Sequence, residues 1–138
     1  MAPAVIAAII GGCFAILVAC FTIAYNHWRN RREKRIEAGK LLRDSFDNST
    51  ETVKDYNGEL STRLIKTLTE YFPIQRKAAH EFRLHLGGRE LKRFNEAWKK
   101  YCGDDEDNPN FVQYAVASDP KAFYLERVQE MLQFTEKT

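Results

Sequence analysis

The 22 residues AVIAAIIGGCFAILVACFTIAY, positions 4–25, carry no charged side chain and determine how this chain of 138 residues is organised. Only Gly11, Gly12 and Thr22 fall outside the apolar class. A helix of this length extends for about 30 Å, which matches the hydrocarbon thickness of a bilayer. The sequence therefore predicts a transmembrane helix over residues 4–25, preceded by a short tail at residues 1–3.

Two other interpretations of this segment stay open. A cleaved secretory signal would begin with a basic region and contain a shorter apolar run, whereas this chain begins with Met-Ala-Pro. A bacterial lipoprotein would be modified on a cysteine, and Leu17-Val18-Ala19-Cys20 resembles the processing motif. Because the segment stays apolar after Cys20, a membrane-spanning helix is favoured over both, with Cys13 and Cys20 in lipid.

A basic stretch follows the apolar segment and continues it as a juxtamembrane helix over residues 26–46. Between Arg29 and Arg43 there are seven basic and two acidic residues, a net charge of +5. Positive charge favours the cytoplasmic side, so we expect an inner (plasma) membrane protein with its N-terminus outside and its C-terminal domain in the cytoplasm. The expected membrane-interface residues are Tyr25, Trp28, Arg29, Arg31, Arg32, Lys34 and Arg35.

Small residues recur along the apolar segment at a spacing of four. They are Ala7, Gly11, Ala15 and Ala19. This spacing places them on one helix face and lets two helix backbones approach closely in lipid. A homodimer through this face is therefore one expected partnership of the chain.

Residues 47–138 are predicted to form a cytosolic helical domain of about four to five helices, and the fold class is all-α. We expect Asp47-Asn48-Ser49-Thr50 to interrupt the first helix, with Asn48 capping the next one. Asn57-Gly58 predicts a second break, followed by a helix from about residue 59 to 71. Pro73 is expected to end that helix and to begin another, whose apolar stripe is Ile74, Ala78, Phe82 and Leu86.

Residues 89–102 have the most regular amphipathic pattern in the chain. Their apolar stripe consists of Leu91, Phe94, Trp98 and Tyr101, with Gly103 as the helix stop. Such a stripe either belongs to the core or, where the core does not cover it, forms a docking face for another protein. We take it as the candidate interaction face. Further along, residues 111–117 are read as a helical turn or a short strand, and Asp119-Pro120 starts a last helix.

A pattern of aromatic and small residues extends over about residues 70–103. It consists of Phe72-Pro73, Ala79, Phe82-Arg83 and Phe94-x-x-Ala97-Trp98-x-x-Tyr101. This pattern resembles one shared by small bacterial membrane-anchored helical proteins without an assigned activity. The resemblance implies a bacterial source and transfers no catalytic residue.

Few residues suggest enzyme chemistry. His80 and His85 are five apart, whereas the zinc-binding HExxH helix needs two histidines four apart. Cys102 precedes Asp104 and Asp105, and nearby negative charge disfavours a thiolate nucleophile. The acidic residues 104–107 lack the Gly and Glu positions of a calcium loop, and Gly87-Gly88 is not followed by the Lys-Ser or Lys-Thr of a phosphate loop.

No metal or cofactor is expected, and nucleic-acid binding is not expected because residues 44–138 carry 14 basic and 17 acidic groups. The leading expectation is a single-pass, non-enzymatic membrane protein whose cytosolic domain binds an unknown protein partner or itself. One alternative is a membrane-anchored enzyme that uses His80, Glu81 and His85, or Cys102. Another is an anionic-lipid-binding protein that acts through the basic juxtamembrane stretch.

Overall fold

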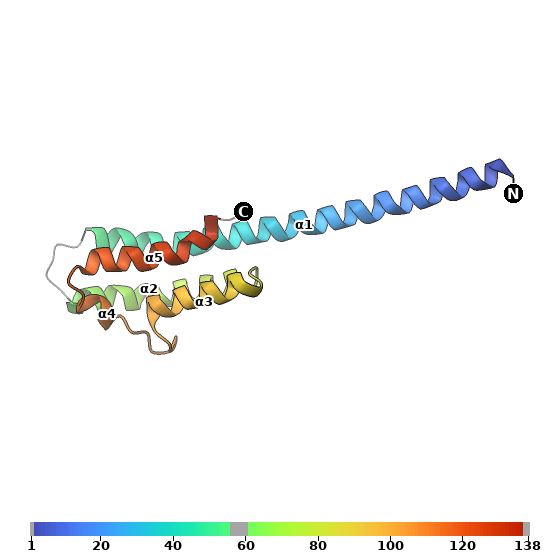
Figure 1. The fold of residues 1–138 in the computed structure, drawn as a ribbon. Helices are drawn as coiled ribbons and strands as arrows, with labels where there is room; N and C mark the ends of the chain where they lie inside the picture. Colours follow the sequence, from blue (N-terminus) through green and yellow to red (C-terminus); the bar gives the residue numbers. More distant parts are fainter. Residues whose placement is uncertain (1, 56–60, 137–138) are drawn as a thin grey trace. The chain divides into compact units, whose positions relative to one another are not determined.

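The computed structural model describes residues 2–55 and 61–136, and this part of the chain forms five helices and no strand. The helices are α1 (Pro3–Lys54), α2 (Ser61–Arg83), α3 (Gly88–Cys102), α4 (Val112–Ala115) and α5 (Pro120–Glu136) (Figure 1). The all-α prediction is confirmed. The chain divides into unit 1, Met1–Lys34, and unit 2, Arg35–Thr138, and α1 contributes to both.

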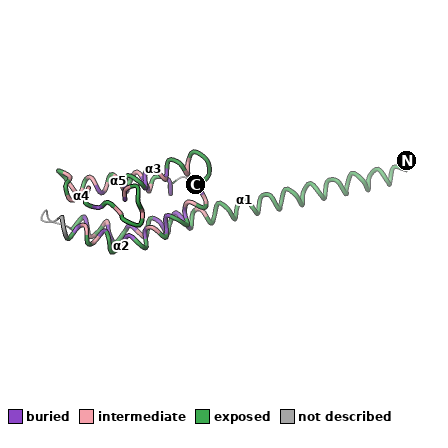
Figure 2. Tube along the Cα trace, turned by 90° about the horizontal axis from the view of Figure 1, so that it is seen from below, coloured by how far each residue is buried: buried purple, intermediate pink, exposed green. Residues whose placement is uncertain are grey.

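Unit 1 consists of the first part of α1 and has no buried side chain among its described residues. Every residue from 2 to 34 is exposed, as the unbroken green of this stretch in Figure 2 shows. Within the described part of the chain, α1 is the one helix long and apolar enough to cross a membrane. The predicted apolar helix is therefore present.

Unit 2 is a helical bundle around an aromatic core. In it α3 packs on α5, while the short α4 packs on both α2 and α5. Phe72 stacks on Trp98 with ring centroids 5.7 Å apart, and Phe82 meets Phe94 edge-on at 5.3 Å. Each large apolar side chain buried in this way stabilises the fold by about 1.5–3 kcal/mol. This core is the main source of stability in unit 2.

The predicted break at residues 47–50 is wrong, because α1 continues to Lys54. Ser49 is buried and donates to the carbonyl oxygen of Phe46, and Thr52 donates to that of Asn48. A hydroxyl group that donates to a carbonyl oxygen of the preceding turn has a hydrogen-bond partner within the helix, so the helix need not end there. Val53 extends the buried side of α1 beyond the polar residues, so packing in unit 2 stabilises a helix that local propensity disfavours.

Pro73 was expected to separate two helices, but it lies inside the continuous helix α2. Proline cannot donate a hydrogen bond to the carbonyl oxygen of Thr69, four residues earlier. Both residues are exposed, so water can hydrate that carbonyl. The predicted stripe of the second half is also corrected at one position: Ile74 is 61% exposed, and Gln75 is buried in its place.

The other helix boundaries agree with the sequence more closely. Gly88, with a φ of +53°, begins α3 after the turn at residues 84–87, and Gly103, with a φ of +91°, ends it. Asp119 accepts a hydrogen bond from the backbone N–H of Ala122 at the start of α5, as expected for a cap. Residues 112–115 form a helical turn rather than a strand. The break expected at residues 57–58 lies outside the described residues.

Candidate functional site

The expected membrane-interface residues lie mostly on exposed parts of α1. The rings of Tyr25 and Trp28 are 6.2 Å apart, and the guanidinium group of Arg32 lies 5.5 Å from the ring of Trp28. A cation above an indole face is attracted by the negative electrostatic potential of the ring. Arg29 forms an exposed pair with Glu33 at 3.6 Å. These contacts place aromatic and basic side chains together at the end of the apolar segment.

Arg35 differs from the other members of that set. It belongs to unit 2, its side chain is only a quarter exposed, and it pairs with Glu90 in the first turn of α3. Its charge is therefore largely neutralised by a residue far away in the sequence. We correct the interface set by removing Arg35, which instead fastens α1 to α3.

The candidate interaction face on α3 is corrected in a similar way. Phe94, Trp98 and Tyr101 are each at most 1% exposed, so they belong to the core and leave no surface for a partner. Leu91 is partly buried at the margin of the core. Of the predicted face, only Leu91 retains accessible surface.

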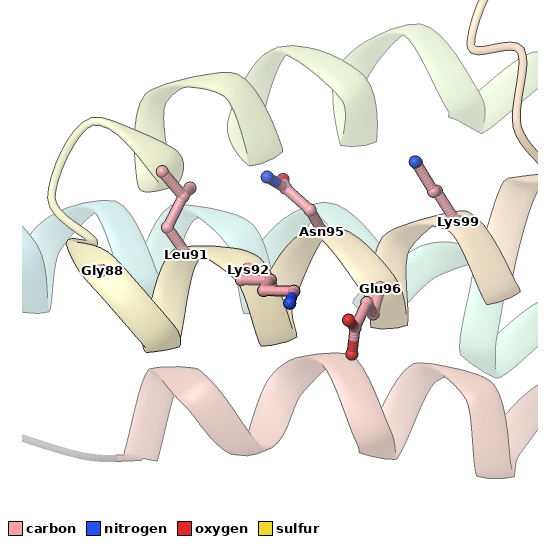
Figure 3. Close-up of a pocket in the computed structure, with 6 residues that line it drawn as sticks. All are labelled: Gly88, Leu91, Lys92, Asn95, Glu96 and Lys99. Atoms are coloured by element: carbon pink, nitrogen blue, oxygen red, sulfur yellow. The ribbon is translucent and has the colours of Figure 1, made fainter.

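Beside that residue, α3 carries a shallow groove of about 400 Å³. It is lined by Gly88, Leu91, Lys92, Asn95, Glu96 and Lys99. Leu91, Asn95 and Lys99 extend from one edge of the helix, and Lys92 and Glu96 from the other (Figure 3). The groove has two cations, one carboxylate and one apolar side chain, which suits a polar contact with another macromolecule better than a buried small molecule.

The acidic loop after α3 is bound to α2 rather than surrounded by water alone. Arg83 donates to Glu106 at 2.9 Å, and His80 and Arg76 approach the other carboxylate oxygen at 3.3 and 3.4 Å. Arg76 also pairs with Asp107 at 2.9 Å. His80, considered above as a catalytic residue, therefore faces a carboxylate in an ion cluster. Sequence reasoning missed this cluster because its members come from α2 and from a loop more than 20 residues later.

Glu106 is the centre of this cluster. Partial burial acts to raise the pKa of its carboxyl group, but the hydrogen bond and charge of Arg83, with help from His80, outweigh burial and lower the pKa. The indole of Trp98 also favours the ionised form, although its buried Nε1 has no partner within strict hydrogen-bond geometry. Glu106 therefore stays charged, and its role in the structure is to hold the loop.

Cys102 is buried at the end of α3, and its environment disfavours nucleophilic chemistry. Burial of the thiol, together with the negative charge of Glu106, raises the pKa of Cys102 to about 12. A thiol reacts as the thiolate, so almost none of this side chain is reactive at neutral pH. Among the described residues no group of three His, Cys, Asp or Glu side chains could hold a metal ion.

A buried hydrogen-bond network joins one residue from each of the five helices. Tyr101 donates to Gln75 Oε1 at 2.6 Å, and Gln75 Nε2 donates to Ser49 Oγ at 2.9 Å. Ser49 Oγ also lies 2.7 Å from the hydroxyl of Tyr124, while Tyr114 donates to the carbonyl oxygen of Tyr101. The polar residues on otherwise apolar helix faces, Ser49 and Gln75, were the signal in the sequence that could have revealed it.

The tyrosine hydroxyls of this network remain neutral. Desolvation by burial raises the pKa of Tyr101, Tyr114 and Tyr124 above the ordinary range. Neutral hydroxyls act as hydrogen-bond donors and acceptors and hold the helices together. The network is therefore suited to a structural role.

Comparisons of the chain with protein-family models, with curated proteins and with solved structures gave no match.

Proposed function

We propose that this chain is a single-pass, non-enzymatic protein of the inner (plasma) membrane, whose unit 2 acts as a protein-interaction or self-association module in the cytoplasm. One observation carries the proposal. Phe14, Leu17 and Phe21 are 65–81% exposed in α1, while unit 2 completes a core of its own from other residues. A helix that is apolar on all sides needs lipid or another protein around it.

The distribution of charge supports the proposed orientation. Exposed arginines at positions 29, 31 and 32 follow the apolar segment directly, and no charged residue precedes it. Basic residues near the end of a span favour the cytoplasmic side. The N-terminus is therefore proposed to lie outside and unit 2 in the cytoplasm.

Two surfaces are proposed for partners. The groove on α3, around Leu91 and Lys99, replaces the buried stripe as the site for a protein partner. In unit 1 the small residues offer a face for self-association, since a Cβ atom added at Gly11 would meet nothing within 4 Å. These two surfaces allow one chain to bind a partner and a second copy independently.

Topology is the decisive measurement. Fusion of paired cytoplasmic and periplasmic reporters after Thr138 should give activity only with the cytoplasmic reporter, and the protein should resist extraction from membranes by alkaline carbonate. Cys102 cannot serve for labelling because it is buried, so a Lys77→Cys variant at an exposed position of α2 is the better check. A periplasmic C-terminus would reject the proposed orientation, and full carbonate extraction would reject the anchor.

Photo-crosslinking tests the partner site. A photoreactive residue placed at Lys99, in the groove, should form a crosslinked species that the same residue at Lys66, exposed on α2, does not form. Equal crosslinking at both positions would reject the groove as the partner site.

A second candidate function is the binding of anionic lipids by the basic stretch. The contact between Arg32 and Trp28 favours it, because an aromatic ring and a cation then lie together at the level of the headgroups. Reversal of charge at Arg31 and Arg32 should weaken recruitment of anionic lipid around the protein if this function holds. Topology must be checked in the same variant, since these residues also set orientation.

A further inference from the structure

The turn between α2 and α3, Leu84–Gly87, presents an apolar side chain to solvent in a fixed position. Leu84 is 82% exposed, more than any other large apolar side chain recorded as exposed in unit 2. The turn is held by three backbone hydrogen bonds, from residues 84, 85 and 86 to carbonyl groups of α2, and Leu86 is buried beneath it. The exposure of Leu84 is therefore a property of an ordered turn.

Three unpaired cations follow this turn. Arg89, Lys92 and Arg93 are exposed, and no ion pair is recorded for them in the described part of the chain. The one acidic residue among them, Glu90, is already paired with Arg35. The start of α3 therefore combines an exposed leucine with three free positive charges, a combination that suits an anionic lipid surface.

The turn lies at the end of unit 2 where the chain enters it. The pair between Arg35 and Glu90 connects the first residue of unit 2 to the first turn of α3. Arg35 follows Tyr25 by ten residues, a tether of about 15 Å in a helix. The far end of unit 2, where Lys121 binds the carbonyl oxygen of Lys54, is 19 residues further along α1. The end of unit 2 that carries Leu84 is therefore joined to the apolar segment by fewer residues of α1 than the far end.

We propose that the turn Leu84–Gly87 and the start of α3 form a second membrane contact. Leu84 enters the interfacial layer of the bilayer that holds residues 4–25, and Arg89, Lys92 and Arg93 bind its anionic headgroups. The opposite edge of the α3 groove, with Leu91, Asn95 and Lys99, stays available to a protein partner. The inference rests on the proposed anchor. It adds a second point of membrane attachment, located in unit 2.

Fluorescent labels at matched positions test this contact in the full chain. Cys13 and Cys20 are replaced by alanine, while the buried Cys102 is retained because it does not react. An environment-sensitive maleimide dye is placed on Leu84→Cys or, as the control, on Val116→Cys beside α4, which is 77% exposed. The protein is reconstituted in vesicles of phosphatidylcholine, with or without phosphatidylglycerol, that contain lipids with a quencher at a known depth.

The dye at position 84 should shift to shorter wavelength and be quenched several-fold more than the dye at 116, and only in vesicles with phosphatidylglycerol. Combined Arg89→Glu, Lys92→Glu and Arg93→Glu changes should abolish that difference, whereas the same changes at the exposed Lys54, Lys66 and Lys77 should preserve it. Equal quenching at 84 and 116, or a response that does not need the anionic lipid, would overturn the proposal.

A third label separates this outcome from failure of the anchor. A dye on Phe14→Cys should be quenched by deep quenchers in both kinds of vesicle. A response at 14 without one at 84 would reject the second contact alone, whereas no response at 14 would reject the anchor and the inference with it.

Discussion

Two apolar surfaces of this chain, residues 4–25 and the stripe on α3, contain similar side chains in opposite environments. Phe21 in the first is 81% exposed, and Phe94 in the second is fully buried. The stripe on α3 has polar residues on the other side of its helix, so unit 2 can cover it and leave the rest in water. Residues 4–25 have no polar face, so this helix needs an apolar environment on all sides.

The largest expected contrast concerns the cysteines. If Cys102 has a pKa of about 12 instead of the usual 9.0, its thiolate population near pH 8 is about a thousand-fold lower than that of an ordinary cysteine. Folded protein should therefore react with a disulfide reagent much faster at Lys77→Cys than at Cys102, because the higher nucleophilicity of a high-pKa thiolate offsets only part of this deficit. Reaction rates in detergent, with Cys13 and Cys20 replaced by alanine, provide the measurement. Comparable rates would show that Cys102 is accessible.

Replacement of an aromatic residue by alanine should affect the free energy of unfolding very differently on the two surfaces. Trp98→Ala removes a fully buried side chain and should lower the free energy of unfolding of unit 2 by about 3–5 kcal/mol. Phe21→Ala should change it by less than about 0.5 kcal/mol. Urea unfolding of the full chain in micelles, followed by circular dichroism, measures both. A large loss in the Phe21 variant would contradict the separation into two units.

The buried network should matter less than the aromatic core. Gln75→Ala leaves the hydroxyl of Tyr101 without its acceptor and should lower the free energy of unfolding by about 2–3 kcal/mol. Gln129→Ala on the exposed side of α5 is the matched control and should have almost no effect. If both variants unfold at the same urea concentration as the unchanged chain, the network does not stabilise unit 2.

The smallest expected effect is that of the ion cluster. Because the pKa of Glu106 is lower in the folded state than its ordinary value of 4.5, ionised Glu106 stabilises the fold above that pH. This stabilisation disappears as the pH falls through the folded pKa. Glu106→Gln should therefore lower the free energy of unfolding by about 1 kcal/mol near neutral pH, since the carboxylate is only partly screened. The side chains that face it are Arg76, His80 and Arg83.

Urea unfolding of both proteins at two pH values measures this effect. At a pH well below the lowered folded pKa of Glu106, the difference between Glu106→Gln and the unchanged chain should approach zero. A difference that stays constant with pH would show that the carboxylate charge is not responsible.

Those features of the fold that depend on residues close together in the sequence could be predicted. The apolar segment, the stripe of α3 and the stop at Gly103 depend on spacing within one helix, and the structure contains all three. The continuation of α1 past Ser49 and of α2 past Pro73 depends on packing against other helices, which no local rule describes. Local signals for a break were present, but tertiary packing outweighed them.

The candidate site was harder to predict than the fold. A stripe such as that of Phe94 and Trp98 has the same pattern whether another helix or a partner covers it. The pairing of Arg35 with Glu90 joins residues 55 positions apart, so no neighbouring residue distinguishes Arg35 from the other basic side chains of this stretch. The proposed surfaces, around Leu84 and along α3, depend on which residues the core leaves uncovered.

The network of Ser49, Gln75 and the three tyrosines also limits sliding between helices. In a core made of apolar side chains alone, only the shape of the packing opposes a shift of one helix along its neighbour. A hydrogen bond of 2.6 Å between Tyr101 and Gln75 does not survive such a step, and the abandoned groups would be left in a dry interior. The network therefore fixes the position of each of the five helices along its own axis, relative to its neighbours in unit 2.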